Sequence, residues 1–179
     1  MRTINLKDQD VEIFAPITEE WAETISRLAN DKYVRDNIGS HSFPFPYRTE
    51  DAMGFITKNR MDGARPFAVD FRIMVNSSMA GVIGLSEIDY TDRKAHIGYW
   101  IAKEFRGRGI ATKATKLVMG YAQQELGIRR LFTKVLATNP ASARVLLKCG
   151  FVLEGVLRED YLQDGRFLDF MIFGYLFRP

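Results

Sequence analysis

Residues 97–112, IGYWIAKEFRGRGIAT, decide the fold class of this chain. An apolar run with strand character leads into a short basic loop, and an apolar segment with helical spacing follows that loop. Gly107 and Gly109 allow positive φ angles and let the backbone come close to a ligand. The first amides of a helix that begins at Ile110 have no partner inside the helix. Together with the helix dipole, these amides favour a bound phosphate or pyrophosphate.

The loop differs from two familiar phosphate-binding motifs. A Walker loop requires Gly-Lys-Ser/Thr after a longer glycine-rich stretch, and residues 106–112 lack it. A dinucleotide fingerprint requires G-x-G-x-x-G, and Thr112 stands where its third glycine is needed. The loop instead contains Arg106-x-x-Gly109-x-Ala111. This pattern indicates an anion site of a third kind.

The composition is that of one folded globular domain. The 179 residues are 46% hydrophobic and 26% charged and contain no repeat or linker, which predicts a single domain over residues 1–179. A net charge of +3 with scattered basic residues gives no reason to expect nucleic-acid binding. Without a signal peptide or an apolar run of about 18 residues, we expect no membrane segment and a cytoplasmic location. The single Cys149 is expected to be a buried apolar residue, and no metal site is predicted.

Hydrophobic periodicity and turn residues predict an α+β domain with a mixed sheet. Strands are expected over residues 11–14, 67–75, 79–89, 94–101, 131–136, 151–156 and 167–177, with a hairpin turn at residues 76–78 and a turn-rich segment around Asp164-Gly165. Helices are expected from the N-cap Thr18 to about Ala29, from Thr49, from Ile110 to the C-cap Gly127, and from the N-cap Asn139 to Gly150, while residues 31–47 are expected to form a loop. Because a whole helix separates residues 94–101 from 131–136, those two strands are expected to be parallel.

Several motifs together carry a family resemblance. Arg106-x-x-Gly109-x-Ala111 is similar to the R/Q-x-x-G-x-G/A motif with which the GNAT superfamily of N-acetyltransferases binds the pyrophosphate of acyl-CoA. Residues 98–101, GYWI, resemble the strand that precedes this motif in that superfamily, and the order of elements resembles the GNAT fold from end to end. The further segments FPFPYRTEDA (43–52), NPAS (139–142) and KCGFVLEG (148–155) resemble the RimJ/RimL branch, which contains N-terminal acetyltransferases of ribosomal proteins.

The resemblance implies a GNAT fold, with a mixed, mostly antiparallel central sheet and flanking helices. It implies that the strand ending at Ile101 is bulged and splays from residues 131–136, so that the pantetheine arm of acetyl-CoA inserts between them. The residues that it assigns to acetyl-CoA are Trp100, Ile101 and Ala102 for pantetheine, Arg106, Gly107, Arg108, Gly109, Ile110, Ala111 and Thr112 for pyrophosphate, and Asn139 on the other wall. Asn139 before Pro140 is equally explained as a helix N-cap, and Trp100 as a core residue.

The resemblance also implies direct attack of a primary amine on the acetyl thioester, without a covalent acyl-enzyme. Where the family often has Glu two residues before Gly98, this chain has His96, whose neutral imidazole could act as base. Glu87 on the neighbouring strand is the other candidate, and each is also explained as a structural or surface residue. The tyrosine acid of many members is replaced by Leu146, and Ser142 matches the serine proposed as its substitute in the RimJ/RimL branch.

The acceptor is expected to bind where residues 31–47 and 158–166 flank the thioester. A partly aromatic mouth is predicted there from Tyr33, Phe43, Phe45 and Tyr161. Neutralising an α-amino group at pH 7 costs about 1.1 kcal/mol and a lysine amine about 4.6 kcal/mol, so a protein or peptide N-terminus suits a weak base. A polyamine, an aminoglycoside and a non-catalytic acyl-CoA-binding domain remain alternatives, and a monomer and a homodimer are both compatible with the sequence.

Overall fold

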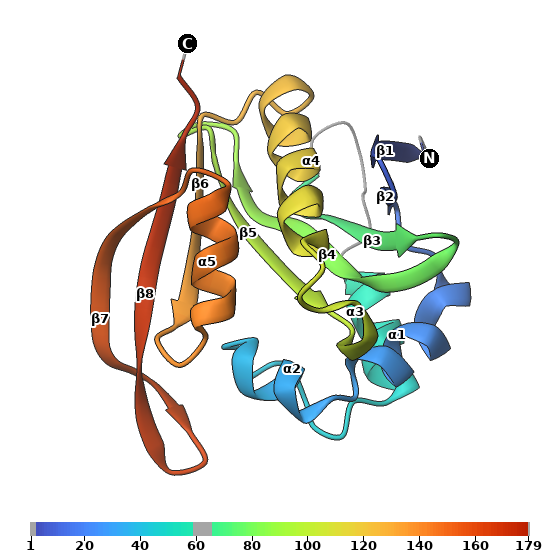
Figure 1. Cartoon of the computed structure of the whole chain (residues 1–179), viewed down its shortest axis with the longest axis horizontal. Helices are drawn as coiled ribbons and strands as arrows, with labels where there is room; N and C mark the ends of the chain where they lie inside the picture. Colours follow the sequence, from blue (N-terminus) through green and yellow to red (C-terminus); the bar gives the residue numbers. More distant parts are fainter. Residues whose placement is uncertain (1–2, 59–65, 179) are drawn as a thin grey trace.

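A central sheet organises the part of the chain that the computed structural model describes, residues 3–58 and 66–178. Within these ranges the strand order is β1-β2-β3-β4-β5-β6-β8-β7, and every neighbouring pair is antiparallel except the parallel pair β5–β6 (Figure 1). The strands are β1 (Ile4–Asp8), β2 (Val11–Ala15), β3 (Val69–Val75), β4 (Ser78–Asp89), β5 (Lys94–Ile101), β6 (Arg130–Leu136), β7 (Val152–Gln163) and β8 (Arg166–Leu176). The α-helices are α1 (Ala22–Ala29), α2 (Lys32–Asn37), α3 (Thr49–Lys58), α4 (Ile110–Gln124) and α5 (Pro140–Lys148), and the 3-10 helices are η1 (Glu19–Trp21) and η2 (Lys103–Phe105). The predicted mixed α+β sheet is confirmed.

Helices cover both faces of this sheet. α4 and α5 lie on one face and α1 and α3 on the other (Figure 1). Alternation along β4 explains the two layers, because successive side chains of a strand point to opposite faces. Ile83 and Leu85 belong to one buried cluster with Val118 of α4, whereas Val82 belongs to a second cluster with Ile25 of α1.

The parallel strands β5 and β6 pair with each other over only the first three residues of each strand. Lys94 to His96 pair with Arg130 to Phe132, and beyond His96 the two strands have no ladder between them. β5 continues to Ile101 along β4, while β6 continues to Leu136 along β8, so each strand follows its other neighbour. The predicted splayed strand pair is therefore confirmed, and its apex lies at His96.

The family resemblance implied a bulged β5. The β-bulge lies instead on the neighbouring strand, β4. Ser86 pairs with His96 and Asp89 with Lys94, so two residues of β4 face one residue of β5. Glu87 adopts a φ of 51°, in the left-handed region. The bulge reverses the alternation, because Ile88 then takes the core face and Glu87 becomes exposed. Uninterrupted alternation would place Glu87 on the same face as Ile83 and Leu85, and the bulge removes it from that face.

Residues 31–47 are not entirely a loop, because they contain α2. Asp31 caps this helix, and its Oδ1 accepts a hydrogen bond from Tyr33 N at 2.7 Å. Six residues are too few to show a helical period in the sequence, so the periodicity missed α2.

Several predicted boundaries also differ. Thr18 precedes η1, but its hydroxyl bonds the Glu20 carboxylate at 2.7 Å and caps no backbone amide. α4 ends at Gln124, before the left-handed Gly127. The short strand β1 was not predicted, and β7 reaches Gln163, so that much of the predicted turn-rich segment is strand. None of the helices within the described ranges has the length and apolar character needed to cross a membrane.

Candidate active site

A cleft of about 1640 Å³ opens where β5 and β6 splay. This volume exceeds that of a usual single-ligand pocket and has room for a cofactor and an acceptor together. The predicted cofactor residues that line the cleft are Trp100, Ile101, Arg106, Gly107, Gly109, Ile110, Ala111, Thr112 and Asn139. Ala102 and Arg108 are not among the lining residues: Ala102 is fully buried, and the Arg108 guanidinium lies 5.8 Å from the Phe105 ring centroid.

The loop before α4 has the geometry of an anion cradle. Gly107 and Gly109 adopt φ angles of 76° and 77°, and a Cβ added to either would meet no heavy atom within 4 Å. The glycines therefore border open space. The first hydrogen bond of α4 runs from Lys113 N to Gly109 O at 3.1 Å, so the preceding amides are available at the helix end. A bound pyrophosphate would satisfy them.

Arg106, at the start of the loop motif, is bound to other parts of the chain. Its Nε donates to Ile101 O at 2.9 Å and its Nη2 to Asp31 Oδ2 at 2.6 Å, and its guanidinium lies 4.4 Å from the Tyr33 ring centroid. Burial alone would raise the pKa of Asp31, but hydrogen bonds from Arg106 and from Tyr33 N hold it below its usual value. In this arrangement Arg106 joins the cradle to α2.

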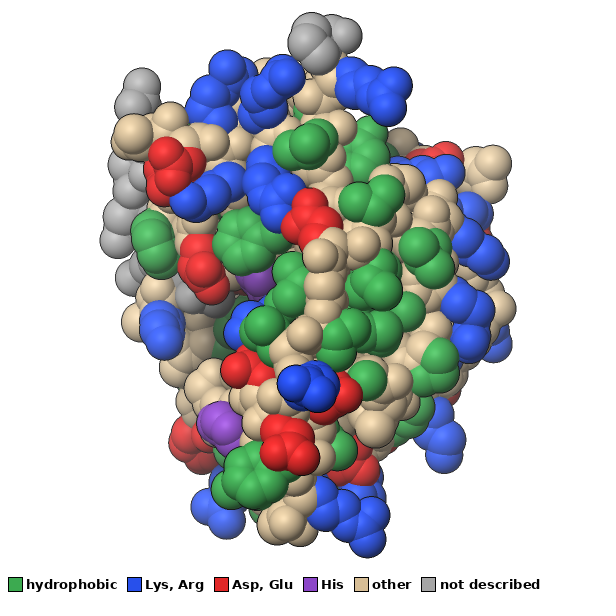
Figure 2. Space-filling model, turned by 90° about the vertical axis from the view of Figure 1, so that its left-hand side faces the viewer, with side chains coloured by type: hydrophobic (Ala, Val, Ile, Leu, Met, Phe, Trp, Pro, Cys, Tyr) green, Lys and Arg blue, Asp and Glu red, His purple; other side chains and the backbone are tan. Residues whose placement is uncertain are grey.

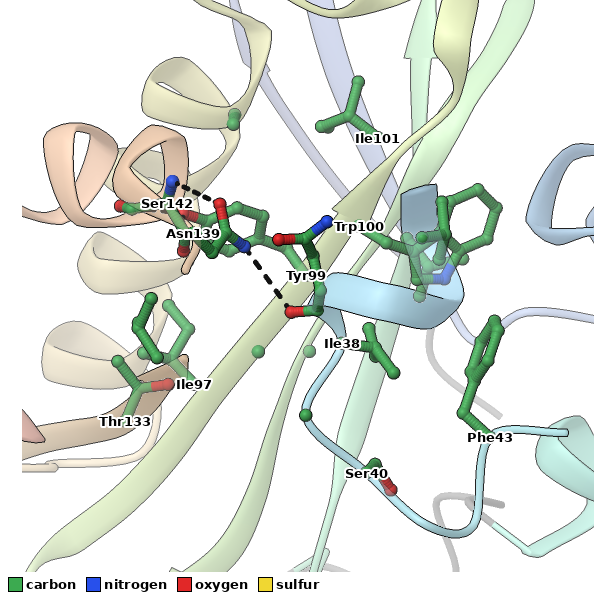
Figure 3. A pocket seen from close by; sticks show the side chains of 18 of the residues that line it. Ile38, Ser40, Phe43, Ile97, Tyr99, Trp100, Ile101, Thr133, Asn139 and Ser142 are labelled. Carbon is green, nitrogen blue, oxygen red and sulfur yellow. Dashed lines mark hydrogen bonds between the residues drawn. The ribbon is translucent and has the colours of Figure 1, made fainter. Parts of the chain in front are cut away.

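Asn139 has the N-cap geometry that the sequence also allowed. Its Oδ1 accepts from Ser142 N at 3.1 Å, and its Nδ2 donates to Asn37 O at 3.4 Å (Figure 3). The side chain thus begins α5 and joins it to the end of α2. Its predicted contact with the cofactor remains a prediction.

Tyr99 is a residue that sequence reasoning missed. Its hydroxyl lies 2.9 Å from Ser142 Oγ, so a phenol on β5 meets a hydroxyl on α5 across the cleft (Figure 3). Burial raises the pKa of Tyr99 to about 12, and the Ser142 hydrogen bond opposes this rise. Leu146 is 1% exposed and lies in the core, so α5 offers an apolar side chain at that position. The strand alternation that aims Tyr99 at α5 was visible in the sequence, but its partner was not.

His96 lies at the apex of the cleft. Its Nδ1 is 3.1 Å from Ser86 Oγ and its Nε2 is 3.4 Å from Thr133 Oγ1. Burial lowers the pKa of His96, and the nearby Glu87 carboxylate partly opposes this. The imidazole is therefore neutral at pH 7. Glu87 also lines the cleft, and the bulge on β4 turns it to the same side as His96.

Three of the four predicted acceptor residues line the cleft. Tyr33, Phe43 and Tyr161 line the cleft, whereas Phe45 is 49% exposed and does not line it. Phe45 follows Pro44 in a segment without regular structure, so no alternation could fix its direction. His41, which the sequence did not single out, stacks on Tyr161 with 4.5 Å between ring centroids.

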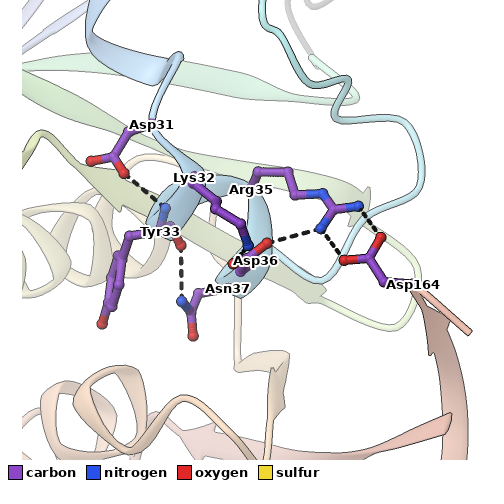
Figure 4. Close-up of polar contacts among 7 residues, drawn as sticks. All are labelled: Asp31, Lys32, Tyr33, Arg35, Asp36, Asn37 and Asp164. Carbon is purple, nitrogen blue, oxygen red and sulfur yellow. Dashed lines mark hydrogen bonds and ion pairs between the residues drawn. The ribbon is translucent and has the colours of Figure 1, made fainter. Parts of the chain in front are cut away.

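Ion pairs connect α2 and its N-cap to the β7–β8 turn as well as to the loop before α4. Arg35 forms a bidentate pair with Asp164 of the β7–β8 turn, at 2.5 and 2.6 Å, and also contacts Asp36 at 2.9 Å (Figure 4). Lys32 pairs with Asp36 as well, at 2.5 Å. Asp31 and Asp36, the acidic residues of this segment, therefore already form ion pairs with cationic side chains of the chain.

Several charged side chains that the sequence did not single out also line the cleft. Arg144 and Lys148 of α5 line it together with the first residues of α4. Glu50 and Lys58 of α3 line it as well, as does Glu87 of β4, which the sequence already offered as a candidate base. Neither carboxylate has a hydrogen bond or ion pair with another residue in the described ranges. These positions are spread over separate elements, so no local motif could have identified them.

Comparisons with known proteins agree with this geometry. A model of the acetyltransferase (GNAT) domain family matches residues 13–152. The putative ribosomal N-acetyltransferase YdaF of Bacillus subtilis is 36% identical over 110 residues, which are 62% of this chain, and the matched part spans 60% of the length of that relative. The spermidine N(1)-acetyltransferase of Vibrio cholerae is 31% identical over 135 residues, 74% of this chain and 76% of that one. A solved structure of the microcin C7 self immunity acetyltransferase MccE, in complex with acetyl-CoA and AMP, has a TM-score of 0.81 at 28% identity and covers 95% of this chain and 94% of its own.

Proposed function

This chain belongs to the GNAT family of acetyltransferases, and we propose that residues 1–179 act as one domain that transfers the acetyl group of acetyl-CoA to a primary amine. The amine attacks the thioester directly in a ternary complex. The open glycine cradle before α4 and the splay of β5 from β6 support the binding of acetyl-CoA. Arg144 and Lys148 add positive charge beside this cradle and suit further phosphate groups of the cofactor.

The preferred acceptor is the α-amino group of a protein or peptide. The observation that carries this choice is the neutral imidazole of His96 at the apex, held between Ser86 and Thr133. Such a base is weak, and removing a proton from an α-ammonium at pH 7 costs about 1.1 kcal/mol, against about 4.6 kcal/mol for a lysine-like amine. His96 would accept the amine proton, directly or through a water, and Ser142 belongs to the opposite wall, from which the thiolate receives its proton.

A small polycationic amine is the second candidate. Glu50 and Glu87 add to the cleft lining two carboxylates that have no ion pair within the described ranges, and the Vibrio cholerae relative is named as a spermidine acetyltransferase. Carboxylates around the amine site favour an acceptor with several positive charges. They also hold such an amine in its protonated form, which opposes attack.

Turnover with three matched acceptors tests these proposals. Release of free CoA is measured with a peptide that has a free N-terminus, with the same peptide blocked at its N-terminus but carrying lysine, and with spermidine. We expect the free N-terminal peptide to give the largest kcat/KM. Preference for spermidine would assign the second candidate instead. CoA binding without turnover of any acceptor would contradict acetyl transfer and favour a non-catalytic binding domain.

We further propose that a second copy of this chain packs against the exposed part of β7 and β8 on the face of the sheet that carries α5. The large side chains on the α5 side of these strands are about half exposed or more: Leu153 51%, Val156 49%, Leu162 47% and Phe167 63%. Hydrophobic side chains gather on this side of the molecule (Figure 2). An apolar patch of this kind can meet its own copy across a two-fold axis without opposing like charges.

The oligomeric state in solution tests this surface. We expect Val156→Glu to shift a dimer to monomers in light scattering after size-exclusion chromatography. Val152→Glu is the matched control, because Val152 is 59% exposed but pairs with Gly174, on the other face of the sheet. A wild-type monomer at high concentration, or equal dissociation by both variants, would contradict the proposal.

A further inference from the structure

Two hydroxyl groups meet where the walls of the cleft approach one another. The Tyr99 hydroxyl lies 2.9 Å from Ser142 Oγ and 3.4 Å from Ser142 O. Both residues line the cleft, one from β5 and the other from the first turn of α5. The pair therefore lies between the splayed strand that faces the cofactor and the helix that faces it from the other side (Figure 3).

The fold places the Tyr99 ring in this position. Alternation along β5 turns Ile97 and Tyr99 to the α4–α5 face, while His96 and Trp100 point to the other face. The ladder to β6 has ended before Tyr99, so no neighbouring strand fills the space beside its ring. The phenol can therefore reach α5, which itself supplies the buried, apolar Leu146 one turn further along.

We propose that the Tyr99 hydroxyl is the acid that protonates the departing CoA thiolate, and that Ser142 is the positioning residue that holds this hydroxyl and relays a proton back to it. This inference rests on the proposed acetyl transfer. It differs from the expectation that Ser142 alone is the acid, because it assigns the donated proton to a residue of the strand and not of the helix.

The neutral amine nitrogen forms a bond to the thioester carbon, and collapse of the tetrahedral intermediate breaks the C–S bond, with the electron pair leaving on sulfur. The Tyr99 O–H gives its proton to that sulfur, which yields the free thiol of CoA. The phenolate regains a proton through the Ser142 hydroxyl from solvent. The proton that the amine loses leaves through the opposite face of the sheet, where His96 lies.

A phenol suits this step better than an aliphatic alcohol. A phenol has an ordinary pKa of about 10, and even the raised value of about 12 for Tyr99 lies within a few units of the pKa of a thiol, about 8.5. Proton transfer is most efficient when the pKa values of donor and acceptor lie close together. Burial raises the pKa of Tyr99 to about 12, so the phenol carries its proton at neutral pH. The serine hydroxyl is a much weaker acid, but it can accept and donate a hydrogen bond at the same time, as a relay requires.

Kinetics of matched variants test the roles of the two hydroxyls. We expect Tyr99→Phe to lower kcat about 100-fold with little change in the KM for acetyl-CoA, since an acid of this kind contributes about 10²–10⁴-fold. Ser142→Ala should lower kcat less, and adding it to Tyr99→Phe should have little further effect. Tyr90→Phe is the control, because Tyr90 also loses a part-buried hydrogen bond, to Pro66 O at 3.0 Å, outside the cleft. A larger loss in Ser142→Ala than in Tyr99→Phe, or equal losses in Tyr99→Phe and Tyr90→Phe, would overturn the assignment.

A second measurement needs no acceptor. The thiol of CoA bound to the protein is titrated by its thiolate absorbance, in wild type and in Tyr99→Phe. A hydrogen bond from Tyr99 to the thiolate lowers the pKa of the bound thiol, so we expect Tyr99→Phe to raise that pKa by about 1–2. An unchanged pKa would overturn the contact with sulfur. If CoA binds and its thiol titrates as expected but no amine is acetylated, the proposed function fails while the Tyr99 contact stands.

Discussion

Replacing Gly109 by Glu should abolish binding of CoA while leaving the chain folded. Gly109 adopts a φ of 77° at the N-cap of α4, and a Cβ there meets no heavy atom within 4 Å. The substitution therefore adds a Cβ without a steric clash. Its cost to the fold is the left-handed backbone alone, about 1–2 kcal/mol. For a chain of this size, that lowers the thermal midpoint by roughly 2–8 °C.

The effect on binding is larger because a carboxylate enters the anion cradle. Two unit charges about 4 Å apart repel by about 4 kcal/mol at an effective dielectric constant of about 20. A repulsion of this size from the pyrophosphate weakens binding by roughly three orders of magnitude. Salt screens part of it, so the loss should shrink at high ionic strength.

The β7–β8 turn provides a matched control. Gly165 also has a φ of 77° and open space around its added Cβ, and it lies in the turn between β7 and β8. Gly165→Glu therefore causes the same kind of backbone strain and adds the same charge away from the cradle. Titration calorimetry with CoA and thermal unfolding are measured for wild type and both variants.

The two variants should lose similar stability, but only Gly109→Glu should lose CoA affinity. If Gly109→Glu binds CoA as tightly as Gly165→Glu, the assignment of residues 106–112 to the pyrophosphate is refuted. If both variants lose binding equally, the loss reflects the fold and not the cradle, and the electrostatic reasoning is refuted as well.

Three further outcomes follow from other contacts. A double-mutant cycle of Asp31→Asn and Arg106→Gln in urea unfolding should give a coupling of about 1–2 kcal/mol, because these side chains are only 21% and 25% exposed and 2.6 Å apart. Since the pKa of Asp31 is lowered in the folded chain, the stability that this ion pair contributes is present above about pH 4 and should be lost as the pH falls through that lower pKa. A double-mutant cycle that shows no coupling at pH 7 contradicts a stabilising ion pair. Because burial lowers the pKa of His96, kcat/KM should rise with pH through a pKa below about 6.5. His96→Gln should abolish this rise and slow turnover roughly 100-fold. A pH dependence of kcat/KM that His96→Gln leaves unchanged argues against His96 as the base. Thr115→Val should stabilise the chain by about 1 kcal/mol in urea unfolding, because Thr115 is fully buried and its hydroxyl has no hydrogen-bond partner in the described ranges; destabilisation would reveal a partner.

The class of protein could be predicted because its evidence is local. The GNAT fold and the acetyl-CoA-dependent N-acetyltransferase family are confirmed by the matched domain and by the eight-stranded sheet within the described ranges. The cradle depends on the φ angles of Gly107 and Gly109 and on the helix that starts at Ile110, and all three lie within four consecutive residues. The roles of the individual residues toward acetyl-CoA stay predictions.

The arrangement of β4 and α2 around the cleft was less predictable. The bulge at Glu87 interrupts the alternation along β4, and one extra residue in a strand cannot be recognised until its partner strand is known. α2 is too short for its period to be read, and its ties to Arg106, Asn139 and Asp164 join residues about 75 to 129 positions apart.

By itself, the sequence determined the family of this chain and the glycine cradle at the start of α4, since backbone conformation and helix capping depend on neighbouring residues. Only the tertiary structure decided which hydroxyls and which imidazole line the cleft together. Tyr99 and Ser142 are 43 residues apart and meet because β5 leaves β6 after His96, which opens the space that the two side chains share. Where a strand parts from its neighbour depends on the packing of the whole sheet, so no local pattern contains it.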